Sequence, residues 1–306
     1  MAARTPSTFS FIGWSQLAIL RLMESLSVQE IREAVRRALA EDIGAGDVTT
    51  LAVVPEHSNA RAQIVAREAL VLAGLDFADS AFRELSSELR VERFAQDGDH
   101  VAAGATILGI SGRAQPMLSA ERVALNFIQR LSGVATLAER FVQAVGGTRA
   151  QILDTRKTTP GWRRFEKYAV ACGGGHNHRM GLFDMVLIKD NHLAALRYEP
   201  PNPIEAAVRR ARERYPDLKV EVEADTPEQV EQALFARADI ILLDNMGVEE
   251  IRTAVAWIGG KAKTEASGGV TLSSARAIAE TGVDYLSVGA LTHSAPAVDI
   301  AMDFEL

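Results

Sequence analysis

The sequence has little cysteine, proline or aromatic content, and it has no long apolar run. A single cysteine, Cys172, among 306 residues cannot form an intrachain disulfide, so packing must hold the fold together, as in a reducing compartment such as the cytoplasm. With 10 Pro and 24% charged residues, the composition argues against wholesale disorder. No apolar stretch approaches the roughly 20 residues that span a bilayer, which excludes a membrane protein.

Positive charge is scarce as well. The 33 Lys and Arg are outnumbered by 40 Asp and Glu, for a net charge of −7, and this balance argues against a nucleic-acid partner. Residues 154–192 reverse it, with seven Lys or Arg against four acids. Three of these cations are expected on a solvated helix face: Arg163, Arg164 and Lys167. The other four stand beside Gly, Pro and Thr or at strand ends, and they predict a small, multiply anionic ligand: Arg156, Lys157, Arg179 and Lys189.

The order of expected elements indicates two domains after a short N-terminal extension, residues 1–27. Residues 28–130 contain short strands, broken by Asp-Gly and Gly turns, around a helix at 75–85, which is typical of a modest α+β domain. Residues 131–306 repeat a pattern of buried apolar strand and amphipathic helix. This run of βα units predicts a barrel or a doubly wound sheet, with strands at 151–155, 185–189, 219–223, 239–244, 262–267 and 284–289.

Two helices carry further signals. Before residue 230, Thr226 can cap a helix, Pro227 suits its first position and Gln229 can complete a capping box. A helix from about 119 to 131 is expected to join the two domains. It has one apolar face and an opposite polar stripe, for which an ordinary solvated face is the simple interpretation: Arg122, Asn126 and Gln129.

The carboxyl ends of the barrel strands are the places to look for chemistry, since barrels build their active sites there. Glu223 and Asp244 end adjacent strands, where they can hold a hard cation such as Mg²⁺ or bind sugar hydroxyls, or simply favour helix N-termini. The glycine turns at 267–270 and 288–291 are placed to bind phosphate through backbone N–H groups, or are only tight turns.

The triple glycine at 173–175 is expected to be a mobile loop that closes over a ligand. His176 and His178 follow it, but their spacing matches no common zinc pattern, so a metal site there is the weaker hypothesis. The sequence has no nucleophile-elbow motif, Walker sequence or dinucleotide fingerprint. Serine-based acyl transfer and ATP hydrolysis therefore lack support.

Seven strings of this sequence closely resemble quinolinate phosphoribosyltransferases, and the resemblance covers residues 28–306: ERVALNFIQRLSG, DTRKTTPGWR, EKYAVACGGGHNHRMGLFDMVLIKDNH, EVEADTPEQ, LLDNM, EASGGV and SVGALTH. The resemblance implies an N-terminal α/β sandwich followed by an incomplete, TIM-like α/β barrel. It implies a homodimer whose active sites are shared between subunits. It also implies that quinolinate and phosphoribosyl pyrophosphate become nicotinate mononucleotide, pyrophosphate and CO₂ in NAD biosynthesis, with Mg²⁺ and without an organic cofactor.

The resemblance also assigns residues. Those that match the quinolinate site are Arg156, His178, Arg179 and Lys189, with Arg122 from the neighbouring chain. Those that match the site of phosphoribosyl pyrophosphate are Thr155, Lys157, Glu223, Asp244, Ser267, Gly268, Gly269, Val288, Gly289, Ala290 and His293. Among these, the expected catalytic residues are Lys157, Lys189, Glu223 and Asp244, and the expected metal ligands are Glu223 and Asp244.

Two alternatives stay open at this point. The first is a related phosphoribosyltransferase for nicotinate, or the similar molybdenum-transport-associated protein. Arg122, Arg179 and Lys189 provide more positive charge than one carboxylate needs, so they suit a substrate with two carboxylates. This argues against the first alternative. The second is a non-catalytic sensor of phosphosugars, and the presence of both Glu223 and Asp244 argues against that, because anion binding gains nothing from buried acids.

Overall fold

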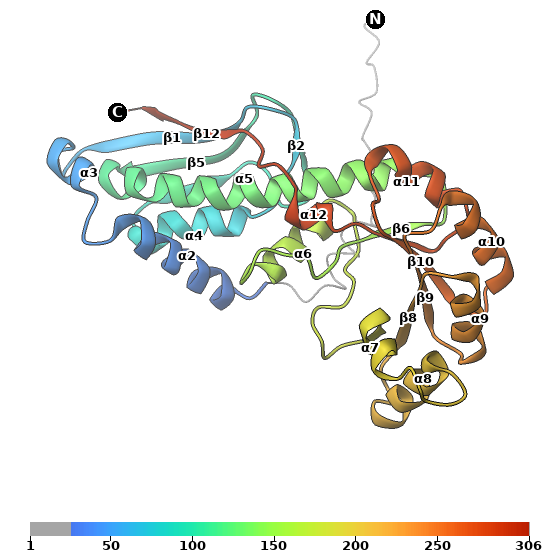
Figure 1. Ribbon diagram of the computed structural model, residues 1–306. Coiled ribbons are helices and arrows are strands. Elements are labelled where there is room, and N and C mark those ends of the chain that lie inside the picture. The colour runs from blue at the N-terminus through green and yellow to red at the C-terminus, as the bar shows by residue number, and fades with distance from the viewer. Residues whose placement is uncertain (1–25, 306) are drawn as a thin grey trace, which may run out of the picture.

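The computed structural model describes residues 26–305, which form two lobes joined by one long helix (Figure 1). The expected extension at 1–27 lies outside the described residues except for Leu26 and Ser27. Ser27 begins the first described helix as the N-terminal part of a capping box, in which its hydroxyl accepts the Glu30 N–H at 3.2 Å and its own N–H donates to Glu30 Oε2 at 2.9 Å. No helix of residues 26–305 has the length and apolarity needed to cross a membrane.

The N-terminal lobe is an antiparallel sheet with helices on one side, as the α+β pattern predicts. Its elements are α2 (Val28–Ile43), α3 (Val48–Val53), β1 (Asn59–Ala66), β2 (Leu70–Val71), α4 (Leu75–Leu85), β3 (Arg90–Arg93), β4 (His100–Val101) and β5 (Thr106–Arg113). The main sheet has the order β12-β1-β5-β3, and β2 pairs with β4 separately. The long helix α5 (Ala114–Ala144) lies against this sheet, with α4 and α2 layered beneath it (Figure 1).

The helix α5 is much longer than the predicted span of 119–131. Its buried face continues through Ala135, Ala138 and Phe141, so the second half of the helix is held by the barrel lobe. Gly133 does not break it, because the glycine is required for close packing: a Cβ atom there would lie 2.0 Å from the carbonyl oxygen of Pro296. The predicted domain boundary at residue 130 therefore falls inside a continuous helix.

The second lobe is an open barrel of six parallel strands, in the order β6-β11-β10-β9-β8-β7. All six strands expected from the sequence are present: β6 (Gln151–Leu153), β7 (Val186–Ile188), β8 (Val220–Ala224), β9 (Ile240–Asp244), β10 (Lys263–Ser267) and β11 (Tyr285–Ser287). The helices of this lobe are α6 (Arg163–Cys172), α7 (Asp190–Ala195), α8 (Pro203–Arg214), α9 (Pro227–Phe235), α10 (Val248–Ile258), α11 (Leu272–Ala279) and α12 (Ala290–His293). Because β6 and β7 end the sheet, the expectation of an incomplete barrel is confirmed.

One cap differs from its prediction. Thr226 does begin α9, where its side chain accepts the N–H of Gln229 at 3.3 Å, and Pro227 stands at the first position. The side chain of Gln229, however, accepts the N–H of Asp225 at 2.6 Å instead of closing the capping box. The amide reaches one residue further back and still satisfies a donor at the helix start.

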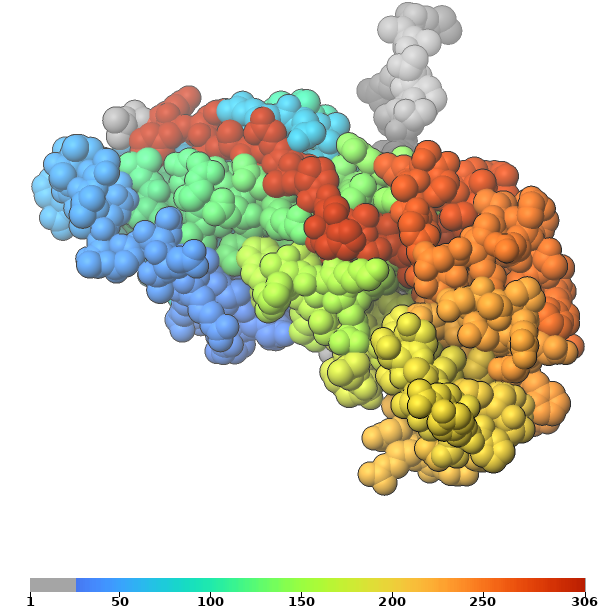
Figure 2. Space-filling model, in the orientation of Figure 1, coloured from blue at the N-terminus to red at the C-terminus, as the bar shows by residue number. Residues whose placement is uncertain are grey.

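The end of the chain leaves the barrel and returns to the N-terminal lobe. The last strand, β12 (Ile300–Glu305), pairs antiparallel with β1 as an edge strand of that sheet. In Figure 2 this terminal segment crosses the surface of α5 between the two lobes. Gln129 of α5 holds it there, since its amide donates to the carbonyl of Ile300 at 2.7 Å. Residues 300–305 thus complete the sheet of the N-terminal lobe, although they fall within the span 131–306 predicted as the barrel domain.

Candidate active site

The strand register brings the predicted residues together. In parallel strands, paired residues project from the same face of the sheet, and so do residues two positions apart. Glu223 pairs with Leu242, which in turn pairs with Glu265. Two residues closer to the carboxyl ends of these strands, Asp244 pairs with Ser267. The same face therefore carries Glu223, Asp244 and Ser267 at neighbouring strand ends.

The other predicted residues lie in the segments that follow these strands. Thr155, Arg156 and Lys157 follow β6, and Lys189 follows β7. Gly268 and Gly269 form the turn after β10 with positive φ values of 94° and 59°. The segment after β11 contains Val288, Gly289, Ala290 and His293. All these segments meet at one edge of the sheet, as the barrel hypothesis requires.

Lys189 and Glu223 form an ion pair across the space between β7 and β8. Glu223 is buried, with 8% of its surface exposed, whereas the Lys189 side chain is 43% exposed. Asp244 is nearby in the sheet and accepts a hydrogen bond from Asn245 Nδ2 at 2.7 Å. The carboxylate of Glu223 is thus neutralised from the exposed side, where a ligand would enter.

Close packing explains two of the glycines. A Cβ atom at Gly289 would lie 3.0 Å from Lys157 Cδ and 3.1 Å from His293 Nε2, so glycine lets both side chains lie close to the backbone of this turn. The carbonyl of Lys157 also accepts the Thr292 hydroxyl at 2.7 Å, which ties the segment after β6 to α12. A Cβ atom at Gly268 would lie 2.1 Å from Asn245 Oδ1.

Two arginines concentrate positive charge in the same region. Burial lowers the pKa of Arg179, and the nearby charge of Arg156 lowers it further. Arg156 Nε is buried without a hydrogen-bond partner in the described structure. The guanidinium of Arg179 donates to the carbonyl of Met185 at 3.2 Å. Two neighbouring guanidinium groups repel each other, and one of them has a donor without a partner. An anion bound between them would relieve the repulsion and accept that hydrogen bond.

Below the site, Lys167 of α6 forms an ion pair with Asp154, and both side chains are fully buried. Lys167 was expected on a solvated helix face, and that prediction is wrong. Asp154 also accepts Asn177 Nδ2 at 2.6 Å and the N–H of His178 at 2.9 Å. Its carboxylate therefore pairs with the lysine and anchors the segment that carries His178 and Arg179.

The triple glycine is packed, so the prediction of a mobile loop is also wrong. A Cβ atom at Gly173 would lie 2.1 Å from the carbonyl oxygen of Ala135 in α5, and one at Gly175 would lie 2.7 Å from Val170 Cγ1. The next residue, His176, forms an isolated parallel bridge with Leu153 of β6. These glycines let the segment pass tightly between α5, α6 and the edge of the barrel.

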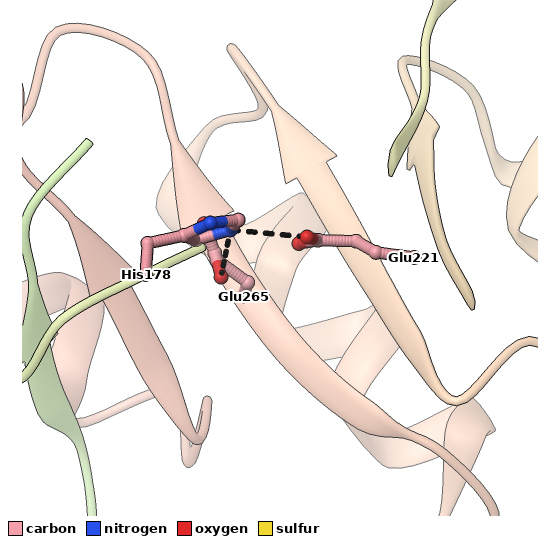
Figure 3. Close-up of side chains that lie close together, drawn as sticks. All are labelled: His178, Glu221 and Glu265. Carbon is pink, nitrogen blue, oxygen red and sulfur yellow. Dashed lines mark ion pairs between the residues drawn. The ribbon is translucent and has the colours of Figure 1, made fainter. Parts of the chain in front are cut away.

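A buried cluster of His178, Glu221 and Glu265 was missed by the sequence argument. Figure 3 shows two carboxyl groups, from β8 and β10, facing the same nitrogen of the imidazole. His178 Nε2 lies 3.0 Å from Glu221 Oε2 and 3.5 Å from Glu265 Oε2. Burial raises the pKa of Glu221 to about 7 and, together with the charge of Glu221, that of Glu265 to about 8. An acid inside an otherwise apolar strand, as in Val-Glu-Val-Glu-Ala, was the available signal.

Arg122 is the predicted site residue that the chain does not bring to this edge. It is exposed on α5, eight residues before Arg130, or about 12 Å toward the N-terminal lobe. Arg130 of the same helix does reach the barrel, where its guanidinium donates to the carbonyls of Ala295 and Thr292 and pairs with the carboxylate of Glu166.

A sandwich domain followed by an open barrel with cations and carboxylates at its strand ends is an architecture suited to phosphoribosyl transfer. Models of the quinolinate phosphoribosyl transferase N-terminal and C-terminal domains match residues 47–132 and 134–303. The chain belongs to the quinolinate phosphoribosyltransferase family.

Individual relatives agree with the family. The chain is 41% identical to a probable nicotinate-nucleotide pyrophosphorylase (carboxylating) of Bacillus subtilis, over 90% of this chain and 94% of that one. It is 44% identical to the Mycobacterium leprae nicotinate-nucleotide pyrophosphorylase (carboxylating), over 89% and 96%. The solved nicotinate-nucleotide pyrophosphorylase of Francisella tularensis is 40% identical, with a TM-score of 0.86 over 92% and 98%. A human nicotinic acid phosphoribosyltransferase, at 13% identity and a TM-score of 0.57 over 92% and 74%, shares the fold alone.

Proposed function

We propose that this protein transfers a phosphoribosyl group from phosphoribosyl pyrophosphate to quinolinate and releases nicotinate mononucleotide, pyrophosphate and CO₂. The observation that carries the proposal is the crowding of Arg156 and Arg179, with a buried guanidinium nitrogen that lacks a partner. With Lys189 at the same edge, this arrangement provides more positive charge than one carboxylate needs. It suits the two adjacent carboxylates of quinolinate.

The reaction balances with groups that the site holds. The ring nitrogen of quinolinate attacks C1 of the ribose while the bond to pyrophosphate breaks, and Lys157 is placed to stabilise the departing negative charge. The carboxylate next to the ring nitrogen then leaves as CO₂, and its electron pair stays on the ring carbon until a solvent proton replaces it. The positively charged pyridinium accepts that electron density, so we propose no organic cofactor.

The carboxylates of Glu223 and Asp244 fit a divalent cation. Both project from the same face of adjacent strands at the carboxyl edge, and oxygen donors are the ligands that Mg²⁺ prefers. When bound, Mg²⁺ would neutralise charge on the pyrophosphate. Lys189 is paired with Glu223. A bound metal ion would therefore have to displace the Lys189 ammonium group or share the Glu223 carboxylate with it.

We also propose that Arg122 serves the site of a second subunit. It is exposed on α5 and lies toward the N-terminal lobe of its own chain, away from the strand ends. A homodimer in which this lobe faces the partner's barrel would complete the set of carboxylate-binding cations. The buried, unpaired thiol of Cys172 is compatible with a reducing compartment, and we propose the cytoplasm.

The decisive experiment is a substrate assay. Purified protein, quinolinate, phosphoribosyl pyrophosphate and Mg²⁺ should give nicotinate mononucleotide and CO₂ in equal amounts, measured by chromatography and by release of labelled carbon from the 2-carboxylate. A Lys157→Met variant should lose at least 100-fold in kcat, since one preorganised group facing developing charge is worth about that much. Turnover of nicotinate in place of quinolinate would contradict the proposal.

The shared site has its own test. Arg122→Ala and Arg179→Ala should each be inactive alone, but a mixture that exchanges subunits should recover activity, because one site of each hybrid dimer regains both arginines. Exchange is monitored with subunits of two different masses. No recovery despite complete exchange would refute the role of Arg122 across the dimer.

A further inference from the structure

Glu221 and Glu265 have no part in the proposed reaction steps, yet both approach His178, which directly precedes Arg179 in the predicted quinolinate site. Glu221 and Glu265 are 0% and 1% exposed, and both approach the same atom, His178 Nε2 (Figure 3). Burying two acids is costly unless they are paired or hydrogen-bonded. Their role is therefore to be sought in His178, the residue that both acids approach.

The other ring nitrogen of His178 decides how the cluster works. The backbone N–H of Arg179 donates to His178 Nδ1 at 2.7 Å, so Nδ1 is the acceptor and carries no proton. The ring proton then belongs on Nε2, which lies 3.0 Å from Glu221 Oε2, although the carboxyl oxygens of Glu221 and Glu265 have no hydrogen-bond partner in the described structure. Burial lowers the pKa of His178, which favours this neutral form.

This tautomer argues against a metal site. The ligand atoms of the three residues all lie within 4.8 Å of one another, close enough to suggest an ion. A metal bound at Nε2 would need the nitrogen that carries the proton, and a metal-bound imidazole usually donates from its other nitrogen, whereas Nδ1 here accepts. Because Nδ1 accepts from the backbone and Nε2 carries the proton, neither ring nitrogen is available to a metal.

We propose that Glu221 and Glu265 are positioning residues that act through His178 on Arg179 and thereby set the affinity for the quinolinate carboxylates. The proposal rests on the proposed function for its substrate. The two acids lie against Nε2, the ring turns Nδ1 toward the backbone of Arg179, and the guanidinium extends from that fixed backbone. Asp154 supports the same segment independently, through the N–H of His178 at 2.9 Å.

Steady-state kinetics test the proposal with two variants of one residue. Glu265→Met removes the carboxyl group, and we expect KM for quinolinate to rise about 10- to 100-fold, by analogy with the loss of a group that orients a metal-binding side chain. KM for phosphoribosyl pyrophosphate should change less than about 3-fold. Glu265→Gln keeps an acceptor oxygen at the same length and should stay within about 3-fold of the parent for both substrates.

The matched control is Asp79→Asn, a carboxylate of α4 that is also buried, at 7% exposure, but lies in the N-terminal lobe. It should lower stability without changing either KM. An equal rise of both KM values in Glu265→Met, or a Gln variant as impaired as the Met variant, would overturn the positioning role. So would stoichiometric zinc in the purified protein that Glu265→Gln loses.

A second measurement reads the cluster in the parent protein and uses a variant only for assignment. Nitrogen-15 NMR of the histidine rings should show one buried imidazole in the neutral Nε2–H form, assigned to His178 by its absence from His178→Gln. An Nδ1–H or metal-bound ring at this position would refute the inference. If the parent protein does not turn over quinolinate, the proposed function fails, while the NMR result still decides the geometry of the cluster.

Discussion

Replacement of Lys167 by methionine tests how much of the fold depends on the ion pair beneath the site. Lys167 and Asp154 are both 0% exposed, so the variant leaves a carboxylate in the interior with only Asn177 and the N–H of His178 as donors. Breaking a buried pair in this way typically costs about 3–5 kcal/mol. That is a large part of the roughly 5–15 kcal/mol by which folded domains are stable.

The matched control is Arg83→Met. Arg83 also pairs with a buried carboxylate, Asp79, but its side chain is 51% exposed, and Arg93 remains to hold the same acid. Water and the second arginine should limit its loss to about 1 kcal/mol or less. Urea unfolding, followed by circular dichroism on both variants, gives the comparison. A Lys167→Met protein as stable as Arg83→Met would refute the idea that the buried pair supports the barrel.

Three other predictions concern single residues. Gly173→Ala should lose about 1–3 kcal/mol in urea unfolding, because its methyl group would lie 2.1 Å from the carbonyl oxygen of Ala135; an unchanged midpoint would contradict the packing argument. Cys172 is 4% exposed and burial raises the pKa of its thiol, so an aromatic disulfide reagent should react with it only after unfolding, and rapid reaction of the folded protein would oppose this. Burial raises the pKa of Glu265 to about 8, so the folded protein holds a proton there that the unfolded chain releases near pH 4.5, and stability should fall between these values as pH rises. Glu265→Gln should flatten that part of the stability curve, and a slope equal to the parent's would count against a raised pKa.

The barrel strands and their functional ends could be predicted because both signals are local. A run such as Asp-Ile-Ile-Leu-Leu-Asp identifies a buried parallel strand, and the residue at its carboxyl end is known as soon as the strand is. Asp244, Lys189 and Ser267 were found in this way. The resemblance to a family then supplied roles that spacing alone left open between ligand binding and helix capping.

What the sequence did not reveal depends on partners far along the chain. Lys167 looks like one cation of a charged helix until Asp154, from the segment after β6, is seen to pair with it. Glu221 and Glu265 lie on different strands, and only the folded barrel places both against His178. The pairing of β12 with β1 joins residues more than 200 positions apart, which no local pattern encodes.

The return of β12 to the N-terminal sheet has a consequence for how the protein is made. The strand β1 is synthesised long before the neighbour on one of its edges, Ile300–Glu305, because more than 200 residues of chain separate the two strands. Until then the first lobe carries an open strand edge, which invites pairing with other chains. Pairing of Ile300–Glu305 with β1 closes that edge and fastens the barrel to the first lobe at the same moment.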